Sequence, residues 1–302
     1  MQLNLDSLQE WLTPLSYFLD KVLVYLNGKF ILKSDAFISV MDRGFLFGDG
    51  VYEVFPVYNG LILGLESHLK RLQDGLDAID IVNPYNKKKW ISIINDLISY
   101  HQESSNQAIY LQVSRGCDDD RKHTHGKLKP TVYMQSTPFQ SPTKGDLLKG
   151  SAAITRDDIR WSQCNTKATS LLANIMYAQE AKKHDVEEVI LIRDGIVTEC
   201  SSSNLFLVTN NCIFTHPKGP YILPGITREV VIDCAKYCDI EVKEVTFNKD
   251  SLMDADEVWI SSSTREIVPI ICIDDKPINN RKVGEIWSLI YDRYQAIKSI
   301  NV

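Results

Sequence analysis

Long hydrophobic runs, a large excess of one charge and low-complexity segments are all missing from this chain of 302 residues. Its apolar runs, such as Val189–Ile192, have the length of strands and fall far short of the ~18–20 residues that a membrane-spanning helix needs. Basic and acidic residues number 33 and 39, and the net charge of −6 argues against electrostatic binding of nucleic acid. We therefore expect a soluble protein with neither membrane nor nucleic-acid partners.

Cysteine is also scarce, with seven residues and no Cys-x-x-Cys pair. An odd number without ligand-like spacing favours neither a disulfide framework nor a zinc site. Cys234 and Cys238 lie one helical turn apart, which is more typical of one buried helix face than of a metal site. Asp6, Glu10 and Asp20 stand near the N-terminus without a basic segment, so no signal peptide is expected. These absences favour a cytoplasmic location and no metal.

The composition that remains is that of a globular protein, with 44% hydrophobic and 24% charged residues. The length allows one large domain or two of ordinary size. Proline, serine, threonine and glycine cluster in Ser136–Gly150, which we interpret as the linker between two domains. We expect an N-terminal extension over residues 1–20, with a short amphipathic helix, then a small α/β domain over 21–137 and a larger domain over 138–302.

Hydrophobic periodicity predicts strands and helices in both halves. β-Branched and aromatic residues predict strands at Val51–Tyr58 and Ile109–Val113. Apolar residues at helical spacing predict helices from Leu65 to Ile79 and at Trp90–Tyr100. The second half adds two hairpins, with turns at Asp194-Gly195 and Asn210-Asn211. Two further helices are expected there, at Leu171–Lys183 and Thr227–Tyr237. The fold class is therefore α+β, and a cleft between two domains is where a small-molecule site usually lies.

Three segments of the second half have the character of phosphate sites. The sequence Leu223–Arg228 places a glycine turn before a helix, which exposes backbone N–H groups and the positive end of the helix dipole. Ser261–Thr264 and Ser201–Ser203 are hydroxyl-rich bends at strand ends. An ordinary N-cap and two polar loops are the alternative interpretation. All three together favour a phosphorylated ligand.

Two further segments attract attention. Lys167 lies between small polar residues ahead of a predicted helix, and a desolvated amine can act as a nucleophile that forms a Schiff base. A solvated surface lysine is the alternative. The glycine-rich stretch Asp42–Gly50 contains too many glycines for a regular element, and it matches neither the P-loop nor the dinucleotide-binding fingerprint.

Taken together, these segments resemble the class IV aminotransferases, which depend on pyridoxal phosphate, and within them the D-amino-acid (D-alanine) transaminases. The Asp-Arg-Gly, Glu-x-Ser-Ser-Ser-Asn and Gly-Ile-Thr-Arg blocks carry the resemblance jointly. The matching stretches run from about Leu23 to near the C-terminus and are DRGFLFGDGVYEV (42–54), HLKRL (68–72), DDIRW (157–161), VTECSSSNLF (197–206), ILPGITREVV (222–231) and SSSTREIVPI (261–270), with the Lys167 segment between the third and fourth.

The resemblance implies a fold of type IV, in which a small N-terminal α/β domain and a larger pseudo-barrel domain hold the cofactor between them. It implies that Lys167 forms the Schiff base with pyridoxal phosphate and moves the proton during transamination. It implies that Glu199 pairs with the pyridine nitrogen, whose protonated form lets the ring accept electrons. The residues implied for the phosphate are Arg71, Ile226, Thr227, Ser262 and Ser263.

The resemblance also implies how substrate handedness is set. Tyr52, together with Arg121 and His123 of an Arg-x-His motif, would bind the substrate carboxylate and aim the Cα–H of a D-amino acid at Lys167. Two departures from the family pattern concern substrate preference. The loop before Arg121 is one residue longer, and Pro56 stands where lysine is familiar. Because proline lacks a strand N–H, it indicates a sheet edge or a bulge there.

The implied activity is ping-pong transfer of an amino group between D-alanine, or another D-amino acid, and a 2-oxo acid such as 2-oxoglutarate or pyruvate. The first alternative is an L-branched-chain aminotransferase or an aminodeoxychorismate lyase on the same scaffold. The second is a cofactor-binding or interaction protein without turnover, which the presence of both Lys167 and Glu199 disfavours. The resemblance further implies a homodimer in which the Arg-x-His motif reaches the neighbouring subunit's site.

Overall fold

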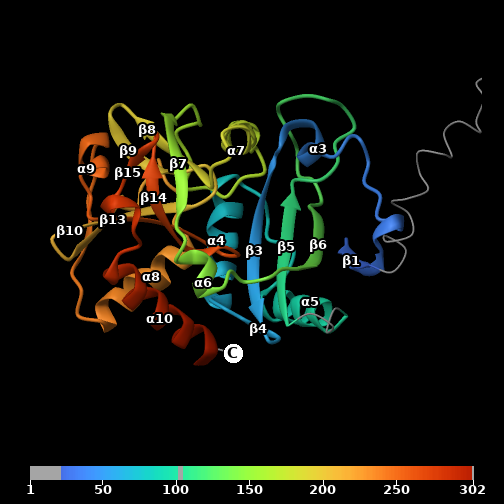
Figure 1. The fold of residues 1–302 in the computed structure, drawn as a ribbon. Helices are drawn as coiled ribbons and strands as arrows, with labels where there is room; N and C mark the ends of the chain where they lie inside the picture. Colours follow the sequence, from blue (N-terminus) through green and yellow to red (C-terminus); the bar gives the residue numbers. More distant parts are fainter. Residues whose placement is uncertain (1–21, 101–104, 301–302) are drawn as a thin grey trace, which may run out of the picture.

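The chain builds two sheets in succession, and its helices pack on them (Figure 1). The computed structural model describes residues 22–100 and 105–300, so the expected N-terminal extension over residues 1–20 lies outside the described residues. Strands β1 to β6 form the first sheet and β7 to β15 the second. The predicted α+β class is confirmed.

The first sheet has six strands in the order β2-β1-β6-β5-β3-β4, each antiparallel to its neighbour. Its strands are β1 (Leu23–Leu26), β2 (Lys29–Leu32), β3 (Gly50–Tyr58), β4 (Leu61–Ile62), β5 (Asn106–Ser114) and β6 (Thr131–Pro138). Helices α4 (Leu65–Ala78) and α5 (Lys87–Ser99) cover one face, because their apolar stripes pack with alternate residues of the strands into one buried cluster. The other face stays partly open.

Pro56 lies in β3 at an edge and without a bulge. The register of β3 against β5 is unbroken and sets Pro56 opposite Ala108. On its other side β3 pairs with β4 only through Val57 and Tyr58. Proline is therefore tolerated where β3 has no neighbouring strand to receive a ladder hydrogen bond.

The second sheet has nine strands in the order β12-β11-β10-β13-β14-β7-β8-β9, with β15 paired to β14. Its strands are β7 (Ser151–Asp157), β8 (Glu188–Arg193), β9 (Ile196–Cys200), β10 (Asn204–Thr209), β11 (Cys212–Thr215), β12 (Val242–Glu244), β13 (Glu257–Ser262), β14 (Glu266–Ile273) and β15 (Lys276–Pro277). The pairs β11–β12, β14–β7 and β7–β8 are parallel, and the other pairs are antiparallel.

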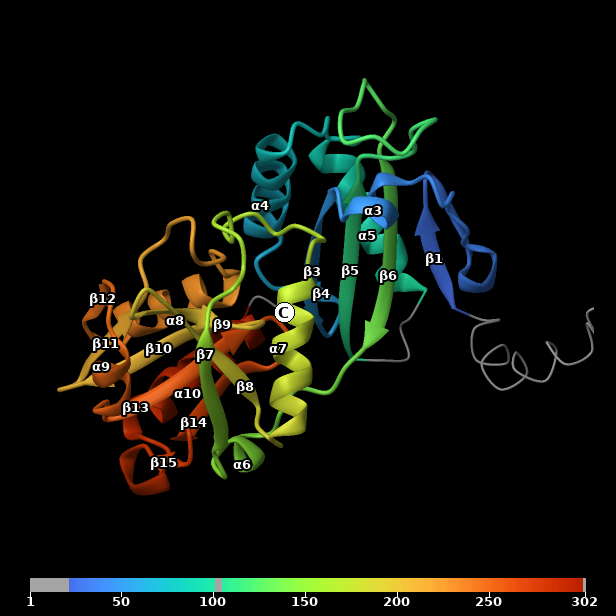
Figure 2. The same ribbon diagram turned by 90° about the horizontal axis from the view of Figure 1, so that it is seen from above.

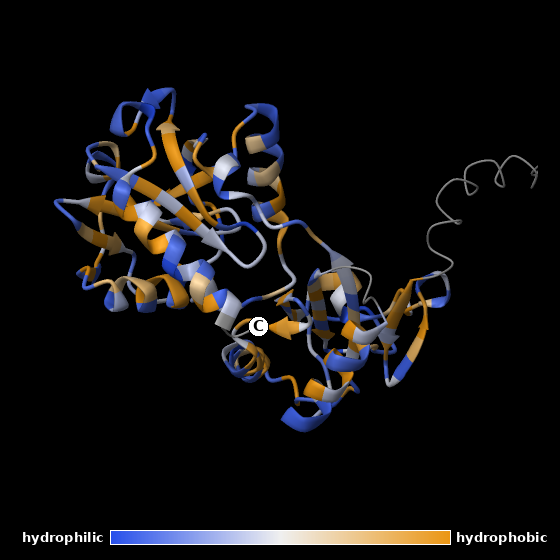
Figure 3. Cartoon of the chain, turned by 60° about the horizontal axis from the view of Figure 1, so that its bottom comes forward, coloured by the Kyte–Doolittle hydropathy of each residue, from blue (hydrophilic) through white to orange (hydrophobic). Residues whose placement is uncertain are grey.

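Helices cover this sheet in two places (Figure 2). Helix α7 (Leu172–Lys183) packs on β7 and β8 in a small cluster around Tyr177 and Val189. Helices α8 (Ile226–Tyr237) and α10 (Glu285–Ile300) pack together over the larger core, which buries Trp259 and Trp287 completely. Figure 3 shows hydrophobic strands inside both halves and hydrophilic turns at their rims, as burial of apolar surface requires.

Both predicted hairpins are confirmed, and their turns have the backbone that the sequence indicates. Asp194 and Gly195 have φ of 51° and 80°, and Asn210 and Asn211 have φ of 51° and 59°. Two consecutive residues in the left-handed region make the turn that suits the twist of a tight hairpin, and Asn, Asp and Gly adopt this region at the smallest cost.

One sequence-based prediction is wrong. The glycine-rich stretch Asp42–Gly50 contains the short helix α3 (Arg43–Phe47), because Asp42 caps its start through Gly44 N and Gly48, at φ 66°, ends it. The stretch Ser136–Gly150, where we expect the domain boundary, contains regular structure. Strand β6 continues to Pro138, and Thr143 caps the short helix α6 (Lys144–Leu147). The domain boundary near residue 137 stays a prediction, and the chain passes from one sheet to the other beside it.

The segment that carries Lys167 is hydrogen-bonded to the first sheet although it follows β7 of the second. Tyr52 N donates to Lys167 O over 3.0 Å, and Thr169 N donates to Gly50 O over 2.9 Å. Val51 and Ala168 form an isolated bridge between them. The start of β3 therefore fixes the backbone on both sides of Lys167.

Candidate active site

A cavity of about 520 Å³ lies between the two sheets. Its walls come from β3, α4, the segment between β7 and α7, α7 itself, the bend between β9 and β10, the start of α8 and the end of β13. Most of the residues that the sequence proposes for the site line this cavity, namely Tyr52, Arg71, Lys167, Glu199, Ile226, Thr227, Ser262 and Ser263. Arg121 and His123 do not.

Lys167 faces Tyr52 across the cavity wall. Its Nζ lies 4.2 Å from the centroid of the Tyr52 ring, and its side chain is half-buried. Because the hydrogen bonds to β3 hold its backbone, this amine has a fixed base from which to reach a ligand.

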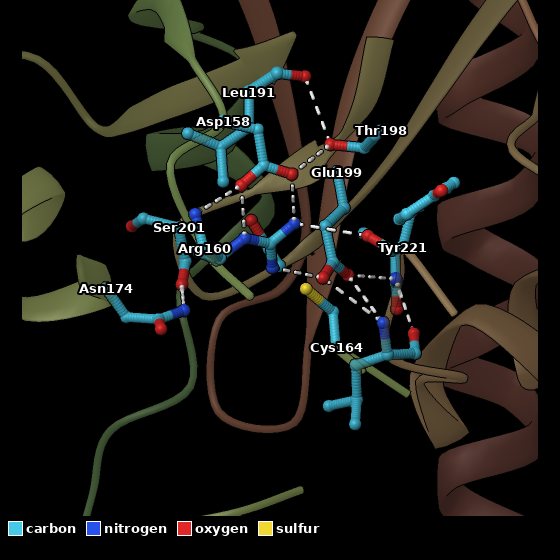
Figure 4. Close-up of polar contacts among 12 residues, drawn as sticks. Asp158, Arg160, Cys164, Asn174, Leu191, Thr198, Glu199, Ser201 and Tyr221 are labelled. Carbon is cyan, nitrogen blue, oxygen red and sulfur yellow. Dashed lines mark hydrogen bonds and ion pairs between the residues drawn. The ribbon is translucent and has the colours of Figure 1, made fainter. Parts of the chain in front are cut away.

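Glu199, at the end of β9, presents a buried carboxylate whose hydrogen-bond partners are all donors (Figure 4). Arg160 Nη1 donates to Oε1 over 2.5 Å, Asn204 Nδ2 donates to Oε2 over 2.9 Å, and Leu223 N lies 3.1 Å from both oxygens. Burial raises the pKa of Glu199 to about 7, while the charge and hydrogen bond of Arg160 act in the opposite direction. Donors from three segments favour the ionised form.

Arg160 is itself held by a second carboxylate. Its Nε and Nη2 donate to the two oxygens of Asp158 over 2.9 and 3.0 Å, while Nη1 remains for Glu199. Thr198 donates to Asp158 over 3.2 Å (Figure 4), and Arg193 pairs with the same carboxylate over 3.1 Å. The guanidinium is thus fixed between two carboxylates, which sets both its direction and its charge.

The start of α8 forms a cradle for an anion. Gly225 precedes the helix and supplies no side-chain cap, and Ile226 and Thr227, the first helical residues, line the cavity. Ser262 and Ser263 line the same cavity, and the Ser261 hydroxyl there is buried with no partner among the described residues. Helix-start amides and hydroxyls suit a phosphate group.

Arg71, on α4, adds a cation to this cradle and is oriented by Glu53. Its Nε and Nη2 each donate to Glu53 over 2.8 Å, and Nη1 donates to Pro224 O over 2.8 Å. Of the five guanidinium N–H groups, two remain for a ligand. Burial raises the pKa of Glu53, but the charge and hydrogen bonds of Arg71, helped by His68, outweigh it and hold the pKa at about 2. Glu53 is therefore ionised, and its negative charge balances the positive charge of Arg71.

The bend Ser201–Ser203 does not offer its hydroxyls to a ligand. Ser202 and Ser203 donate to Glu188 over 2.9 and 3.0 Å, and Ser201 also donates to Glu188. Arg265 Nη2 reaches the same carboxylate over 2.8 Å. The expectation that these hydroxyls bind phosphate is corrected, since they shape the cavity wall around Glu188.

Arg121 and His123 lie on the exposed loop between β5 and β6, outside the cavity. The described chain does not bring them to Lys167, which accords with the expectation that they serve a neighbouring subunit. That expectation stays a prediction.

Sequence reasoning missed the charged residues that orient the site: Glu53, Asp158, Arg160, Glu188 and Arg265. Glu53 follows Tyr52 directly, and Arg160 stands inside the matching block DDIRW, so the sequence could have pointed to both residues. It could not have pointed to their partners, because residues such as Arg160 and Glu199 are far apart in the sequence and no local spacing joins them.

The described residues contain neither a cluster suited to a metal ion nor a helix suited to a membrane. Over residues 22–100 and 105–300, no three His, Cys, Asp or Glu side chains gather in a way that would hold a metal ion. In the same ranges no helix has both the length and the apolar character to cross a membrane.

Comparison with known proteins gives consistent matches. The family model described as "Amino-transferase class IV" matches residues 50–273. A D-alanine aminotransferase of Bacillus licheniformis is 39% identical over 87% of this chain and 92% of its own length. That of Listeria innocua is 37% identical over 90% of this chain and 94% of its own. The crystal structure of a branched-chain aminotransferase from the archaeon Thermoproteus uzoniensis, with norvaline, aligns with a TM-score of 0.83 at 26% identity, over 91% of this chain and 94% of that one.

Proposed function

Because the chain belongs to the class IV aminotransferases, we propose that it is a D-amino-acid transaminase that works with pyridoxal phosphate. It would move the amino group between D-alanine, or another D-amino acid, and a 2-oxo acid such as 2-oxoglutarate or pyruvate. One observation carries the proposal, namely that Lys167, Glu199 and an anion cradle line a single cavity. A scaffold without turnover has no use for this combination.

The cavity has the groups that this cofactor needs. The phosphate would lie in the cradle of Arg71, the amides at Ile226 and Thr227, and the hydroxyls of Ser262 and Ser263. The buried Ser261 hydroxyl, which lacks a partner among the described residues, is a further sign that a polar ligand belongs there. When bound, the cofactor supplies an electron sink for the charge that develops at the substrate Cα.

Glu199 would accept a hydrogen bond from the pyridine N–H. A bond of this kind to a charged group contributes roughly 1.5–3 kcal/mol and keeps that nitrogen protonated. Arg160 supports it by favouring the ionised carboxylate. Lys167 Nζ would anchor the cofactor and take up and return the proton at the substrate Cα, as a positioned general base and acid.

The substrate carboxylate would be bound by Tyr52 of one subunit and by Arg121 and His123 of its partner. An exposed apolar surface beside the cavity supports a homodimer, because such patches mark interfaces. This surface, the α7 patch, consists of Ile159, Trp161, Leu172, Ile175 and Met176, each at least half exposed. Ile159, Trp161 and Ile175 also line the cavity, so a partner seated on the patch would lie at its mouth.

The alternative within the family is transfer from L-branched-chain amino acids or lysis of aminodeoxychorismate. The relatives at 39% and 37% identity are D-alanine aminotransferases, whereas the branched-chain aminotransferase at 26% shares the fold. The balance of identity favours the D-amino acid.

Location and domain limits are part of the same proposal. All seven cysteines are free thiols, which supports a reducing cytoplasm. The change of sheet between β6 and β7 supports a boundary near residue 137. No metal is needed for the reaction as proposed.

A spectral titration tests the activity. The purified holoenzyme is mixed separately with D-alanine, L-alanine, a branched L-amino acid and aminodeoxychorismate. Loss of the absorbance of the lysine-bound cofactor with D-alanine, restored by pyruvate, is the expected result. A response to the branched L-amino acid alone would favour the alternative, and no response to any amino acid would remove transaminase activity altogether.

A further inference from the structure

The Asp-Arg-Gly stretch, which does not line the cavity, is hydrogen-bonded through Arg43 to the loop that carries Arg121 and His123. We infer that Arg43 is a positioning residue for the substrate-carboxylate trap, acting through the backbone of this loop. The inference rests on the proposed function, since it assigns Arg121 and His123 to the trap.

Arg43 is almost completely buried and its guanidinium forks onto two consecutive carbonyls of the loop. Nη1 donates to Lys122 O over 2.7 Å, and Nη2 donates to His123 O over 2.9 Å. These two peptide groups lie on either side of His123, and Arg121 stands one residue before the first of them. Fixing both carbonyls therefore fixes the direction in which the His123 side chain leaves the loop, and it anchors the backbone just after Arg121.

Phe47, one helical turn after Arg43, adds an aromatic contact for the same side chains. The Arg121 guanidinium carbon lies 5.1 Å from the centroid of its ring, and the His123 ring centroid lies 5.7 Å from it. The Arg43 guanidinium carbon lies 4.8 Å from the same ring. One aromatic ring thus contacts the gripping arginine and both trap residues.

Arg43 is itself held in place by ion pairs. Its Nε pairs with Asp49 over 2.8 Å, and Arg115 pairs with both oxygens of Asp49 over 2.8 and 3.0 Å. Arg115 in turn donates to the carbonyls of Ile79 and Asp80, at the end of α4. The hydrogen bonds from Arg43 to the loop are therefore anchored, through Asp49 and Arg115, to the first sheet and to the end of α4 rather than to other loop residues.

The loop has little internal structure to replace this grip. Residues 117–127 contain no helix and no strand, only an isolated bridge between Cys117 and Asp42, and their side chains are mostly exposed. Within them Lys122 N donates to Asp120 O, and Lys122 Nζ stands 3.9 Å from Asp118. The position of Arg121 and His123 thus depends on contacts made from Arg43 and Phe47.

Arg43→Lys is the informative substitution, because lysine keeps the charge beside Asp49 but cannot fork onto two carbonyls. Holoenzyme kinetics should show KM for D-alanine raised by about tenfold to 100-fold with kcat little changed, since a displacement near 1 Å has effects of this size. Cofactor absorbance should stay native. Lys127→Ala, which removes an exposed cation from the same loop, is the matched control and should keep the native KM.

A double-mutant cycle separates positioning from general stability. In an Arg121→Ala/His123→Ala background the added effect of Arg43→Lys on KM should disappear, because both side chains that it positions are gone. Full additivity, or parallel losses in kcat, cofactor affinity and melting temperature, would mean that Arg43 is only structural and would overturn the inference.

Hydrogen exchange provides a readout independent of activity. Amides of residues 117–127 should exchange faster in Arg43→Lys than in the native protein and in Lys127→Ala, and equal exchange would overturn the inference. Failure of the proposed function and failure of this inference give different results. If the native enzyme does not react with D-alanine, the proposed function is contradicted. If the native enzyme is active, Arg121→Ala impairs it and Arg43→Lys does not, only this inference is contradicted.

Discussion

At the scale of single residues, the candidate site consists of buried carboxylates and the cations that face them. Glu199 has only donors around it, and Arg160 is the charged one. Glu53 stands in the same relation to Arg71. In each pair the partner that would touch the ligand is held by one that would not, so activity is expected to be sensitive to both.

The Glu199 pair gives a prediction about pH. A raised carboxyl pKa means that Glu199 is mostly neutral below about pH 7 and ionised above it, and only the ionised form pairs with a pyridinium. This part of the affinity for pyridoxamine phosphate should therefore grow as pH rises through about 7. In Arg160→Met this increase in affinity should occur at higher pH, because the Arg160 charge that lowers the pKa of Glu199 is lost.

Fluorescence titration of the native and variant apoproteins from pH 6 to 9 measures this difference. The intrinsic titration of the ligand is common to both proteins and cancels in the comparison. Arg156→Met, which removes a half-exposed arginine paired with Glu180, is the control and should follow the native curve. Arg160→Lys provides a second variant should the first be unstable, and superimposable curves for all of them would refute the role of Arg160.

Lys167 gives the second prediction at this scale. Lys167→Ala should lower the rate of amino transfer from D-alanine to 2-oxoglutarate by at least roughly 10²–10⁴-fold, the range expected for loss of a positioned general base and acid. Lys218→Ala, at an exposed lysine paired with Glu229, should keep the native rate. A Lys167→Ala variant that turned over as fast as the native enzyme would show that another amine does the work.

At the scale of elements, the start of α8 joins the anion cradle to the Glu199 side of the cavity through Asn204. A Cβ on Gly225 would stand 2.0 Å from the Asn204 side-chain oxygen. Asn204 Nδ2 donates to Glu199 and to Leu223 O. A change at the helix start is therefore transmitted to the carboxylate that would meet the pyridine ring.

Gly225→Ala is accordingly expected to weaken cofactor binding by about tenfold or more, since a forced shift of this kind typically costs about 1–3 kcal/mol. Equilibrium binding of pyridoxal phosphate measures it. Gly219→Ala is the matched control, because its added Cβ would find nothing closer than 4.0 Å. Equal affinity in both variants would show that Asn204 moves aside freely.

Elements are also where the sequence was most informative. Hairpin turns and amphipathic helices were predictable because Asp194-Gly195, Asn210-Asn211 and the stripe from Leu65 to Ile79 are local patterns. Helix α3 was not, since two residues, Asp42 and Gly48, define it among glycines. The residues proposed to face the ligand were named from the family blocks. Arg43 and Glu53 stand in one of these blocks too, but only the folded chain brings their partners near them.

At the scale of the whole molecule, the α7 patch predicts how two copies associate. Leu172 and Met176 lie one turn apart on α7 and are 73% and 54% exposed. Leu172→Glu with Met176→Glu should convert a dimer into a monomer, since two desolvated charges would oppose burial. Light scattering measures the mass. Val82→Glu, at an equally exposed apolar residue near α4, is the control and should leave the dimer intact. If the Leu172→Glu/Met176→Glu variant remained a dimer, the interface would have to lie outside the α7 patch.

The backbone of the Lys167 segment has a consequence for the way the protein could be divided. Gly50 and Tyr52 hold a stretch of chain that lies beyond the proposed boundary near residue 137. A cut at that boundary would leave Lys167 on one fragment and its hydrogen-bonded support on the other. Neither piece would possess a complete reaction centre, and the two would have to recombine to restore one. The gene could be split there, but its product would act only as a reassembled pair.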